Sequence, residues 1–183
     1  MNIAVMALQG AFIEHEAMLR RLGADCFEVR QASDWDRPKD GLILPGGEST
    51  VQRRLLDDLG LFGAVRRDIL AGLPVLGTCA GMILLSEEHL ATMHMRVRRN
   101  AYGRQLGSFH TEERVEGIGE NVPMTFIRAP YIEETLSEAC EAIARVDGNI
   151  VAAREGKQIA TAFHPELDGD TRIHEAFLAL VSK

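Results

Sequence analysis

The stretch Gly77-Thr78-Cys79-Ala80-Gly81 lies between two apolar runs, Leu-Pro-Val-Leu at 73–76 and Met-Ile-Leu-Leu at 82–85. Small residues on both sides of one reactive side chain are typical of a nucleophile elbow, a sharp turn from a buried strand into a helix that lifts the central side chain out of the backbone. The lifted side chain here is a thiol, which gains thiolate character at a helix N-terminus. The stretch therefore predicts a strand at 73–76, a following helix, and Cys79 as a nucleophile that attacks a carbonyl carbon.

A second motif, His164-Pro165-Glu166, follows the apolar run at 159–163. We expect His164 to take the thiol proton and Glu166 to hold the imidazole ring, so the two motifs together predict a Cys79-His164-Glu166 catalytic triad. The remaining cysteines and histidines have no comparable neighbours, and we interpret them as structural residues: Cys26, Cys140, His15, His89, His94, His110 and His174.

The length and composition of the chain favour an intracellular enzyme. Its 183 residues fit one domain, 1–183, and its net charge of −7 argues against nucleic acid as a partner. Three cysteines without disulfide-framework spacing predict a reducing compartment, the cytoplasm. The first residues have no basic leader and are too short to cross a bilayer, so we expect no membrane association. The one basic cluster fits either a strand face or an anion site: Arg96, Arg98, Arg99 and Arg104.

Short apolar runs alternate with amphipathic patterns along the first half of the chain. They predict strands at 3–8, 26–29 and 41–44, and helices at 13–22, 49–59 and 62–71. Shorter strand-like runs follow at 95–99, 105–109, 124–127, 142–146, 150–153 and 159–163, before a closing helix at 171–181. This alternation predicts an α/β fold, a flavodoxin-like three-layer sandwich with helices on both faces of a mostly parallel sheet and with the reactive groups at the carboxyl ends of the strands.

The loop Pro45-Gly46-Gly47-Glu48-Ser49-Thr50 follows the buried strand predicted at 41–44. Two consecutive glycines let backbone N–H groups approach a ligand closely, and the lysine of a phosphate-binding loop is missing. We therefore predict an oxyanion hole formed by the N–H groups of Gly47 and Ala80. Gln9-Gly10, at the end of the first strand, is expected to lie beside this loop.

The elbow, the Gly46-Gly47 loop and His164-Pro165-Glu166 together resemble class I (triad) glutamine amidotransferases. Three further stretches resemble the glutaminase subunits of pyridoxal 5′-phosphate synthase, the PdxT/SNO family: Leu-Gln-Gly-Ala-Phe at 8–12, Arg-Asn-Ala-Tyr-Gly-Arg-Gln at 99–105 and Phe-Ile-Arg-Ala-Pro at 126–130. The resemblance runs from the first predicted strand to the last predicted helix.

The resemblance implies an enzyme that hydrolyses L-glutamine to L-glutamate and ammonia through a glutamyl thioester on Cys79. It also implies that the ammonia passes to a barrel-shaped synthase subunit of the PdxS/SNZ type in a hetero-oligomer. Pyridoxal 5′-phosphate would then be the product of the complex, and we expect neither a cofactor nor a metal in this chain. By the same resemblance, the residues that contact glutamine are Gly46, Gly47, Glu48, Arg104, Ile127 and Arg128.

Three alternatives stay open. A glutaminase subunit of another amidotransferase, such as imidazole glycerol phosphate synthase, would share the triad. A DJ-1/PfpI-like cysteine protein would share the elbow but would not need a glutamate two residues after the histidine. A catalytically silent binding subunit would have lost a triad residue, whereas all three are present here.

Overall fold

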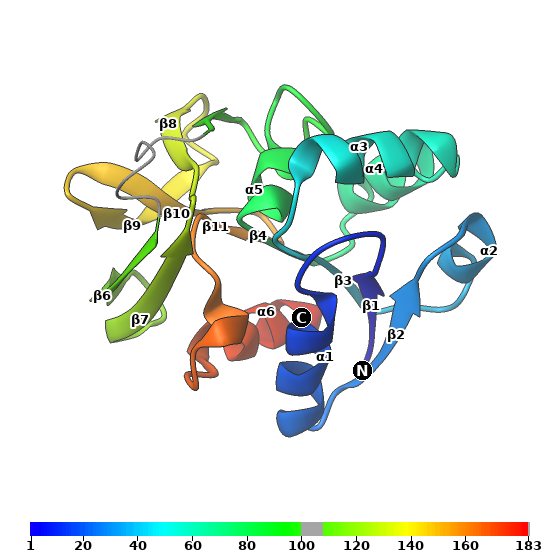
Figure 1. The fold of residues 1–183 in the computed structure, drawn as a ribbon, viewed down its shortest axis with the longest axis horizontal. Coiled ribbons are helices and arrows are strands. Elements are labelled where there is room, and N and C mark those ends of the chain that lie inside the picture. The colour runs from blue at the N-terminus through cyan, green and yellow to red at the C-terminus, as the bar shows by residue number, and fades with distance from the viewer. Residues whose placement is uncertain (100–107, 183) are drawn as a thin grey trace.

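The computed structural model describes residues 1–99 and 108–182, in which helices cover both faces of a central sheet (Figure 1). The strands are β1 (Asn2–Met6), β2 (Asp25–Val29), β3 (Gly41–Leu44), β4 (Val75–Thr78), β5 (Met95–Arg98), β6 (Ser108–Val115), β7 (Gly119–Ile127), β8 (Tyr131–Thr135), β9 (Glu141–Val146), β10 (Asn149–Glu155) and β11 (Gln158–Thr161). The helices are α1 (Phe12–Arg21), α2 (Ala32–Trp35), α3 (Ser49–Asp58), α4 (Phe62–Leu70), α5 (Ala80–Leu85) and α6 (Arg172–Val181), with a 3₁₀ turn η1 (Pro165–Leu167). The expected α/β fold class is confirmed.

The order of strands in the main sheet is β2-β1-β3-β4-β11-β10-β8-β5, with β9 paired to β10. From β2 to β11 the adjacent strands pair parallel, and from β11 onward, beginning with the β11–β10 pair, they pair antiparallel. Strands β6 and β7 form a separate antiparallel hairpin. Because β3, β4 and β11 are adjacent and parallel, the segments that follow them meet at one edge of the sheet. Those segments carry the Gly46-Gly47 loop, Cys79 and His164.

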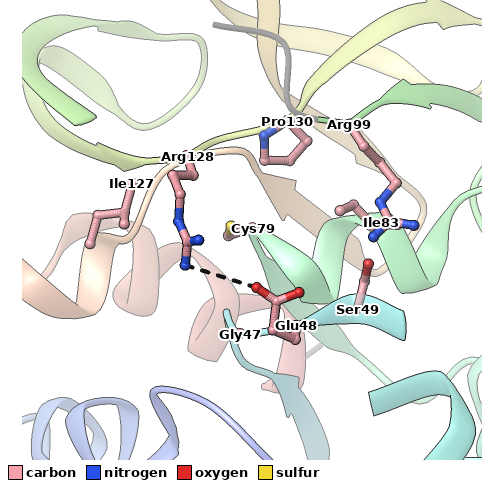
Figure 2. Close-up of a pocket in the computed structure, with 9 residues that line it drawn as sticks. All are labelled: Gly47, Glu48, Ser49, Cys79, Ile83, Arg99, Ile127, Arg128 and Pro130. Carbon is pink, nitrogen blue, oxygen red and sulfur yellow. Dashed lines mark ion pairs between the residues drawn. The ribbon is translucent and has the colours of Figure 1, made fainter. Parts of the chain in front are cut away.

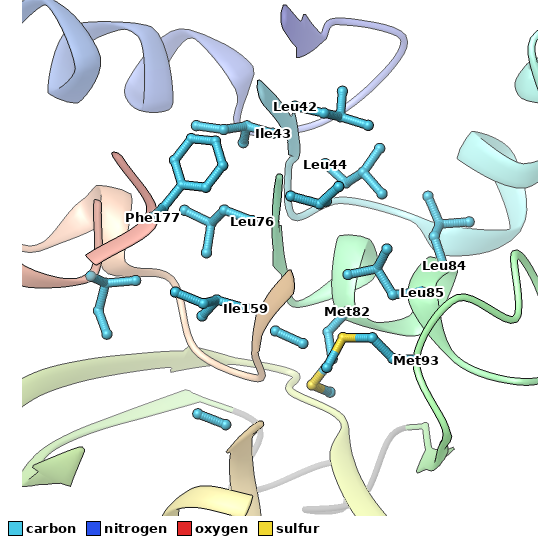
Figure 3. Close-up of a cluster of buried hydrophobic side chains, with 14 of the residues drawn as sticks. Leu42, Ile43, Leu44, Leu76, Met82, Leu84, Leu85, Met93, Ile159 and Phe177 are labelled. Atoms are coloured by element: carbon cyan, nitrogen blue, oxygen red, sulfur yellow. The ribbon is translucent and has the colours of Figure 1, made fainter. Parts of the chain in front are cut away.

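The parallel strands are apolar because helices bury them on both faces. Helices α1 and α6 lie on one face, and α3, α4 and α5 lie on the other (Figure 1). Side chains from both layers meet those of the central strands, among them Leu44 of β3, Leu76 of β4, Met82 of α5 and Phe177 of α6 (Figure 3). A Cβ at Gly41 would lie 2.9 Å from the Phe177 ring, so the first residue of β3 has no side chain where α6 packs closely.

Three elements differ from the sequence expectation. Helix α2 and strand β8 were not predicted, and the hairpin strand β7 is longer than the run expected at 124–127. The indole N–H of Trp35 in α2 donates to Asp68 Oδ2 at 2.9 Å, which anchors this one-turn helix to α4. Arg104 and part of the strand expected at 105–109 lie outside the described residues. No helix among residues 1–99 and 108–182 has the length and apolar character that a membrane crossing requires.

Candidate active site

Cys79 lies in the turn between β4 and α5, and its backbone φ angle is 49°. A positive φ is uncommon for a residue with a Cβ and persists only where the surrounding structure imposes it. The two flanking glycines show how it is imposed. A Cβ at Gly81 would overlap the carbonyl oxygen of Leu44, and a Cβ at Gly77 would lie 2.7 Å from Leu85 Cδ1. The predicted elbow is confirmed, and its glycines are explained by close packing of α5 on β3, at Gly81, and on β4, at Gly77.

His164 follows β11, and its ring interacts with both other residues of the predicted triad. His164 Nδ1 lies 2.7 Å from Glu166 Oε1, and the Cys79 side chain is near enough to raise the pKa of the ring. Gly46 lies directly against this ring, because a Cβ at that position would overlap Cε1 of His164. Cys79, His164 and Glu166 are each exposed by no more than 7% of their surface. The structure therefore brings the three residues together in the order Cys-His-Glu.

The electrostatics of this group favour a protonated His164. Burial alone would lower the pKa of His164, but the hydrogen bonds to Cys79 and Glu166, together with their negative charges, raise it to about 10. Burial alone would raise the pKa of Glu166, yet His15 and His164, which face its carboxylate, hold it below its usual value. An imidazolium held by an ionised carboxylate is suited to donating a proton to a leaving group.

A pocket opens above Cys79 and contains most of the residues expected to contact substrate (Figure 2). Its lining consists of Gly47, Glu48, Ser49, Cys79, Ile83, Arg99, Ile127, Arg128 and Pro130. Of the other expected residues, Gly46 lies against His164, Ala80 is the first residue of α5, and Arg104 is outside the described residues.

Two arginines give the pocket a positive rim. Arg128 has a φ of 44°, and its guanidinium lies 3.9 Å from the Glu48 carboxylate (Figure 2). Arg99 donates to Thr50 Oγ1 at 3.0 Å. Arg96 and Arg98 pair instead with glutamates of β8 on the sheet surface. The basic cluster therefore divides into a strand face, Arg96 and Arg98, and a pocket residue, Arg99, which the sequence analysis had not separated from them.

The loop after β1 fixes the Gly46-Gly47 segment. Glu48 N–H donates to Gln9 Oε1 at 2.7 Å, and Ala11 N–H donates to the carbonyl oxygen of Gly46 at 3.0 Å. A Cβ at Gly10, whose φ is 106°, would overlap that same carbonyl oxygen. The expected placement of Gln9-Gly10 beside the loop is confirmed.

The sequence analysis missed two buried histidines behind the triad. His15 of α1 and His174 of α6 have no exposed surface, and their rings lie 2.9 Å apart from Nδ1 to Nε2. His15 Nε2 lies 3.4 Å from Glu166 Oε2. Each histidine occupies the buried face of its helix, next to Leu19 in α1 and to Phe177 in α6. A histidine within an apolar stripe requires a polar partner from another element, and this is the signal from which their pairing could have been predicted.

Comparison with known proteins identifies the family of the chain. Residues 5–183 match the model of the SNO glutamine amidotransferase family. The chain is 55% identical to "Pyridoxal 5'-phosphate synthase subunit PdxT" of Desulfitobacterium hafniense over 189 residues, covering 100% of this chain and 94% of the relative. It is 53% identical to the protein of the same name from Methanocorpusculum labreanum, covering 100% and 98%.

Solved structures agree with the fold. A crystal structure of a glutamine amidotransferase superposes with a TM-score of 0.91 at 39% identity, covering 99% of both chains. A second glutamine amidotransferase, from Thermotoga maritima, is 16% identical with a TM-score of 0.66, covers 99% of this chain and 84% of that one, and supports the fold alone. The chain, with its elbow cysteine and its adjoining histidine and glutamate, belongs to the SNO glutamine amidotransferase family.

Proposed function

We propose that this chain is the glutaminase subunit of a pyridoxal 5′-phosphate synthase and that residues 1–183 form one glutaminase domain. The observation that carries the proposal is the group of Cys79 with the hydrogen-bonded pair His164 and Glu166, at a pocket lined by both carboxylate and guanidinium groups. Membership in the SNO family and the similarity to relatives named PdxT support this choice. The reaction is the hydrolysis of L-glutamine to L-glutamate and ammonia.

In the first half-reaction, the Cys79 sulfur attacks the carboxamide carbon of glutamine. The C–N bond then breaks, His164 gives its proton to the departing nitrogen, and ammonia leaves a glutamyl thioester on Cys79. In the second half-reaction, His164 takes a proton from water, which attacks the thioester carbonyl and releases glutamate. Glu166 keeps the imidazole oriented through both steps by accepting from Nδ1.

Each half-reaction passes through a tetrahedral oxyanion, and we assign its two donors to the N–H groups of Gly47 and Ala80. Ala80 is the first residue of α5, so its N–H lies at the positive end of that helix. Gly47 lines the same pocket as the Cys79 thiol. The Ala80 N–H is fixed in advance of the reaction by the elbow, whereas the Gly47 N–H is the donor that we expect docking of the synthase subunit to orient.

The charges at the rim fit the amino-acid end of glutamine. We assign its α-carboxylate to the guanidinium groups of Arg128 and Arg99 and its α-ammonium to the Glu48 carboxylate. We also assign Ile127 and Gly46 to the residues that contact glutamine. The contact expected for Arg104 stays a prediction. The direct experiment measures glutamate formed from glutamine by the purified chain, with and without a synthase subunit. No glutamate under either condition would contradict the proposal.

Replacing Arg128 with alanine is expected to raise the KM for glutamine by about 10- to 100-fold with little change in kcat, because a charge-assisted hydrogen bond to the α-carboxylate is lost in the ground state and the transition state alike. Steady-state kinetics check this. The matched control is Arg96→Ala, which removes an arginine paired to Glu134 on the sheet surface and leaves KM unchanged. An unchanged KM in the Arg128 variant would remove that residue from the substrate site.

We propose that ammonia passes to a PdxS/SNZ-type barrel subunit in a hetero-oligomer and that docking activates the glutaminase. The peptide between Gly46 and Gly47 is the expected moving part. Its carbonyl accepts from Ala11 N–H, and because C=O and N–H of a trans peptide point in opposite directions, turning the Gly47 N–H requires that bond to break. The loop at 8–12 thus couples the docking partner to the oxyanion hole. The unpaired thiols of the chain support a reducing compartment, the cytoplasm, as the place of reaction.

Glutamine turnover is expected to rise at least about tenfold when the synthase subunit binds, which corresponds to about 1.4 kcal/mol of barrier. Glutaminase assays of the free chain and of the complex measure it. A Gln9→Ala variant, which loses the hydrogen bond to Glu48 N–H, is expected to respond less to the partner. Equal rates with and without the partner would refute activation, and a fully responsive Gln9 variant would remove that residue from it.

A further inference from the structure

A chain of hydrogen-bonding groups continues behind Glu166 into the core. The Nε2 atom of His15 lies 3.1 Å from Thr78 Oγ1 and 3.4 Å from Glu166 Oε2, and its Nδ1 atom lies 2.9 Å from His174 Nε2. These side chains come from four segments: α1, β4, η1 and α6. Glu166 Oε2 is fully buried and accepts no hydrogen bond among the described residues, and His15 Nε2, 3.4 Å away, is the polar group that faces it.

Both histidines behind the carboxylate are neutral at pH 7. Burial lowers the pKa of His15, and burial together with His15 lowers the pKa of His174 to about 3. The charged and titratable groups that act on His15 are Glu166, His164 and Glu14. Each neutral ring carries one N–H, so the His15–His174 contact allows two arrangements of the protons.

The unpartnered atoms distinguish the two arrangements. If His15 donated from Nδ1, its Nε2 lone pair would face the ionised Glu166, and His174 would keep a buried Nδ1–H that has no partner among the described residues. If His174 donates from Nε2 to His15 Nδ1, then His15 Nε2–H faces Thr78 and Glu166, and a lone pair on His174 Nδ1 and the hydroxyl hydrogen of Thr78 are left over. The second arrangement avoids the repulsion between a lone pair and the ionised Glu166, and the hydrogen it leaves over is on a hydroxyl that can rotate, so it is the favourable one.

We propose that His15 is a positioning residue for the proposed glutaminase reaction: its Nε2–H, fixed in this tautomer by His174, hydrogen-bonds Thr78 Oγ1 and attracts Glu166 Oε2 from 3.4 Å, so that Glu166 Oε1 stays directed at His164. The inference rests on the proposed function. The contact with His15 keeps the Glu166 carboxylate oriented during catalysis, because Glu166 then holds a single rotamer while the His164 imidazole gains and loses its proton. Thr78 directly precedes Cys79, so the same N–H also contacts the elbow.

The first test reads the tautomer in the unmodified protein. Long-range ¹H–¹⁵N NMR of the ¹⁵N-histidine-labelled chain at pH 7 is expected to show His15 protonated at Nε2 and not at Nδ1. The His15 signals are assigned by their loss in a His15→Gln variant. A ring protonated at Nδ1, or at both nitrogens, would overturn the proposal, and this measurement does not depend on whether any variant folds.

The second test uses two amides that each mimic one ring nitrogen. In His15→Gln the amide nitrogen reaches the place of Nε2 and still donates towards Glu166, whereas in His15→Asn the amide reaches only the place of Nδ1. In the complex with the synthase subunit, we expect His15→Asn to lose about 10- to 100-fold in kcat with KM unchanged. A loss of this size is typical when a residue that orients a functional side chain by a hydrogen bond is removed. His15→Gln is expected to keep kcat within about threefold.

Alkylation of Cys79 by iodoacetamide gives a readout that needs no glutamine. The pH at which alkylation of Cys79 falls off on the acidic side is expected to rise by about one pH unit in His15→Asn. Without the His15 donor, Glu166 stabilises the His164 imidazolium less, and the imidazolium stabilises the Cys79 thiolate less. His15→Gln is expected to restore the profile. If both variants lose activity in proportion to their thermal unfolding temperatures, with the Gln variant no better than the Asn variant, His15 is structural and the proposal fails.

These outcomes separate the inference from the function on which it rests. A wild-type complex that forms no glutamate would refute the glutaminase assignment, while the tautomer and alkylation measurements would still report on His15. An active wild-type complex whose His15→Asn variant has unchanged kcat and an unchanged alkylation profile would refute the inference alone.

Discussion

Replacing Cys79 with alanine is expected to abolish glutamine hydrolysis, with turnover falling by at least about 10⁴-fold, because no thioester can form without the sulfur. The fold should be retained, since the thiol is held at the elbow by its backbone and the substitution removes a single atom. Glutamate release measures the activity, and mass spectrometry of the wild-type chain quenched with glutamine is expected to show the covalent glutamyl adduct that the variant lacks.

The other two cysteines supply matched controls. Burial raises the pKa of Cys26, and burial with the nearby Glu155 raises the pKa of Cys140 to about 12, so neither thiol suits a nucleophile at neutral pH. Cys26→Ser and Cys140→Ser are therefore expected to keep glutaminase activity. Comparable inactivation by all three changes would contradict the assignment of Cys79.

Removal of His164, the base, is expected to lower kcat nearly as much as removal of Cys79, the nucleophile. His164→Asn should lose at least about 10⁴-fold in kcat, because the thiol loses its proton acceptor and the departing ammonia its proton donor. Glu166→Gln is expected to lose less, about 10³-fold, because the ring still reaches the productive tautomer part of the time. Steady-state kcat values of the complex measure both effects.

A second histidine–carboxylate pair provides the control for these variants. His94 Nδ1 lies 2.5 Å from Glu155 Oε1, and His94 is largely exposed and lines no part of the pocket. His94→Asn and Glu155→Gln are expected to leave kcat unchanged. If Glu166→Gln kept wild-type turnover, the orienting carboxylate would have to be another residue near His164.

The sequence predicted the elbow because its determinants are local. A positive φ at Cys79 needs small neighbours, and Gly77, Ala80 and Gly81 stand within two residues of it. The parallel strands β3 and β4 were also predictable, since burial on both faces leaves short apolar runs with no polar face. The glutamate two residues after His164 belongs to the same short segment, so its place beside the ring follows from the motif.

Other elements carried no such signal. The hairpin strand β6 exposes most of its residues, so its sequence shows no apolar run from which its length could be predicted. Strand β8 is stabilised by pairing with β5 and β10 rather than by a pattern of its own. Helix α2 has only four residues, fewer than the helical period needs to become visible.

The sequence by itself predicted the α/β architecture and the candidate triad Cys79, His164 and Glu166, because the strand, elbow and His-Pro-Glu patterns are each local. Only the tertiary structure decided which arginine of the basic cluster enters the pocket and what lies behind Glu166. His15 and His174 are 159 positions apart and meet because α1 and α6 cover the same face of the sheet. A contact between two such helices depends on how the whole sheet is ordered, and no local pattern encodes that order.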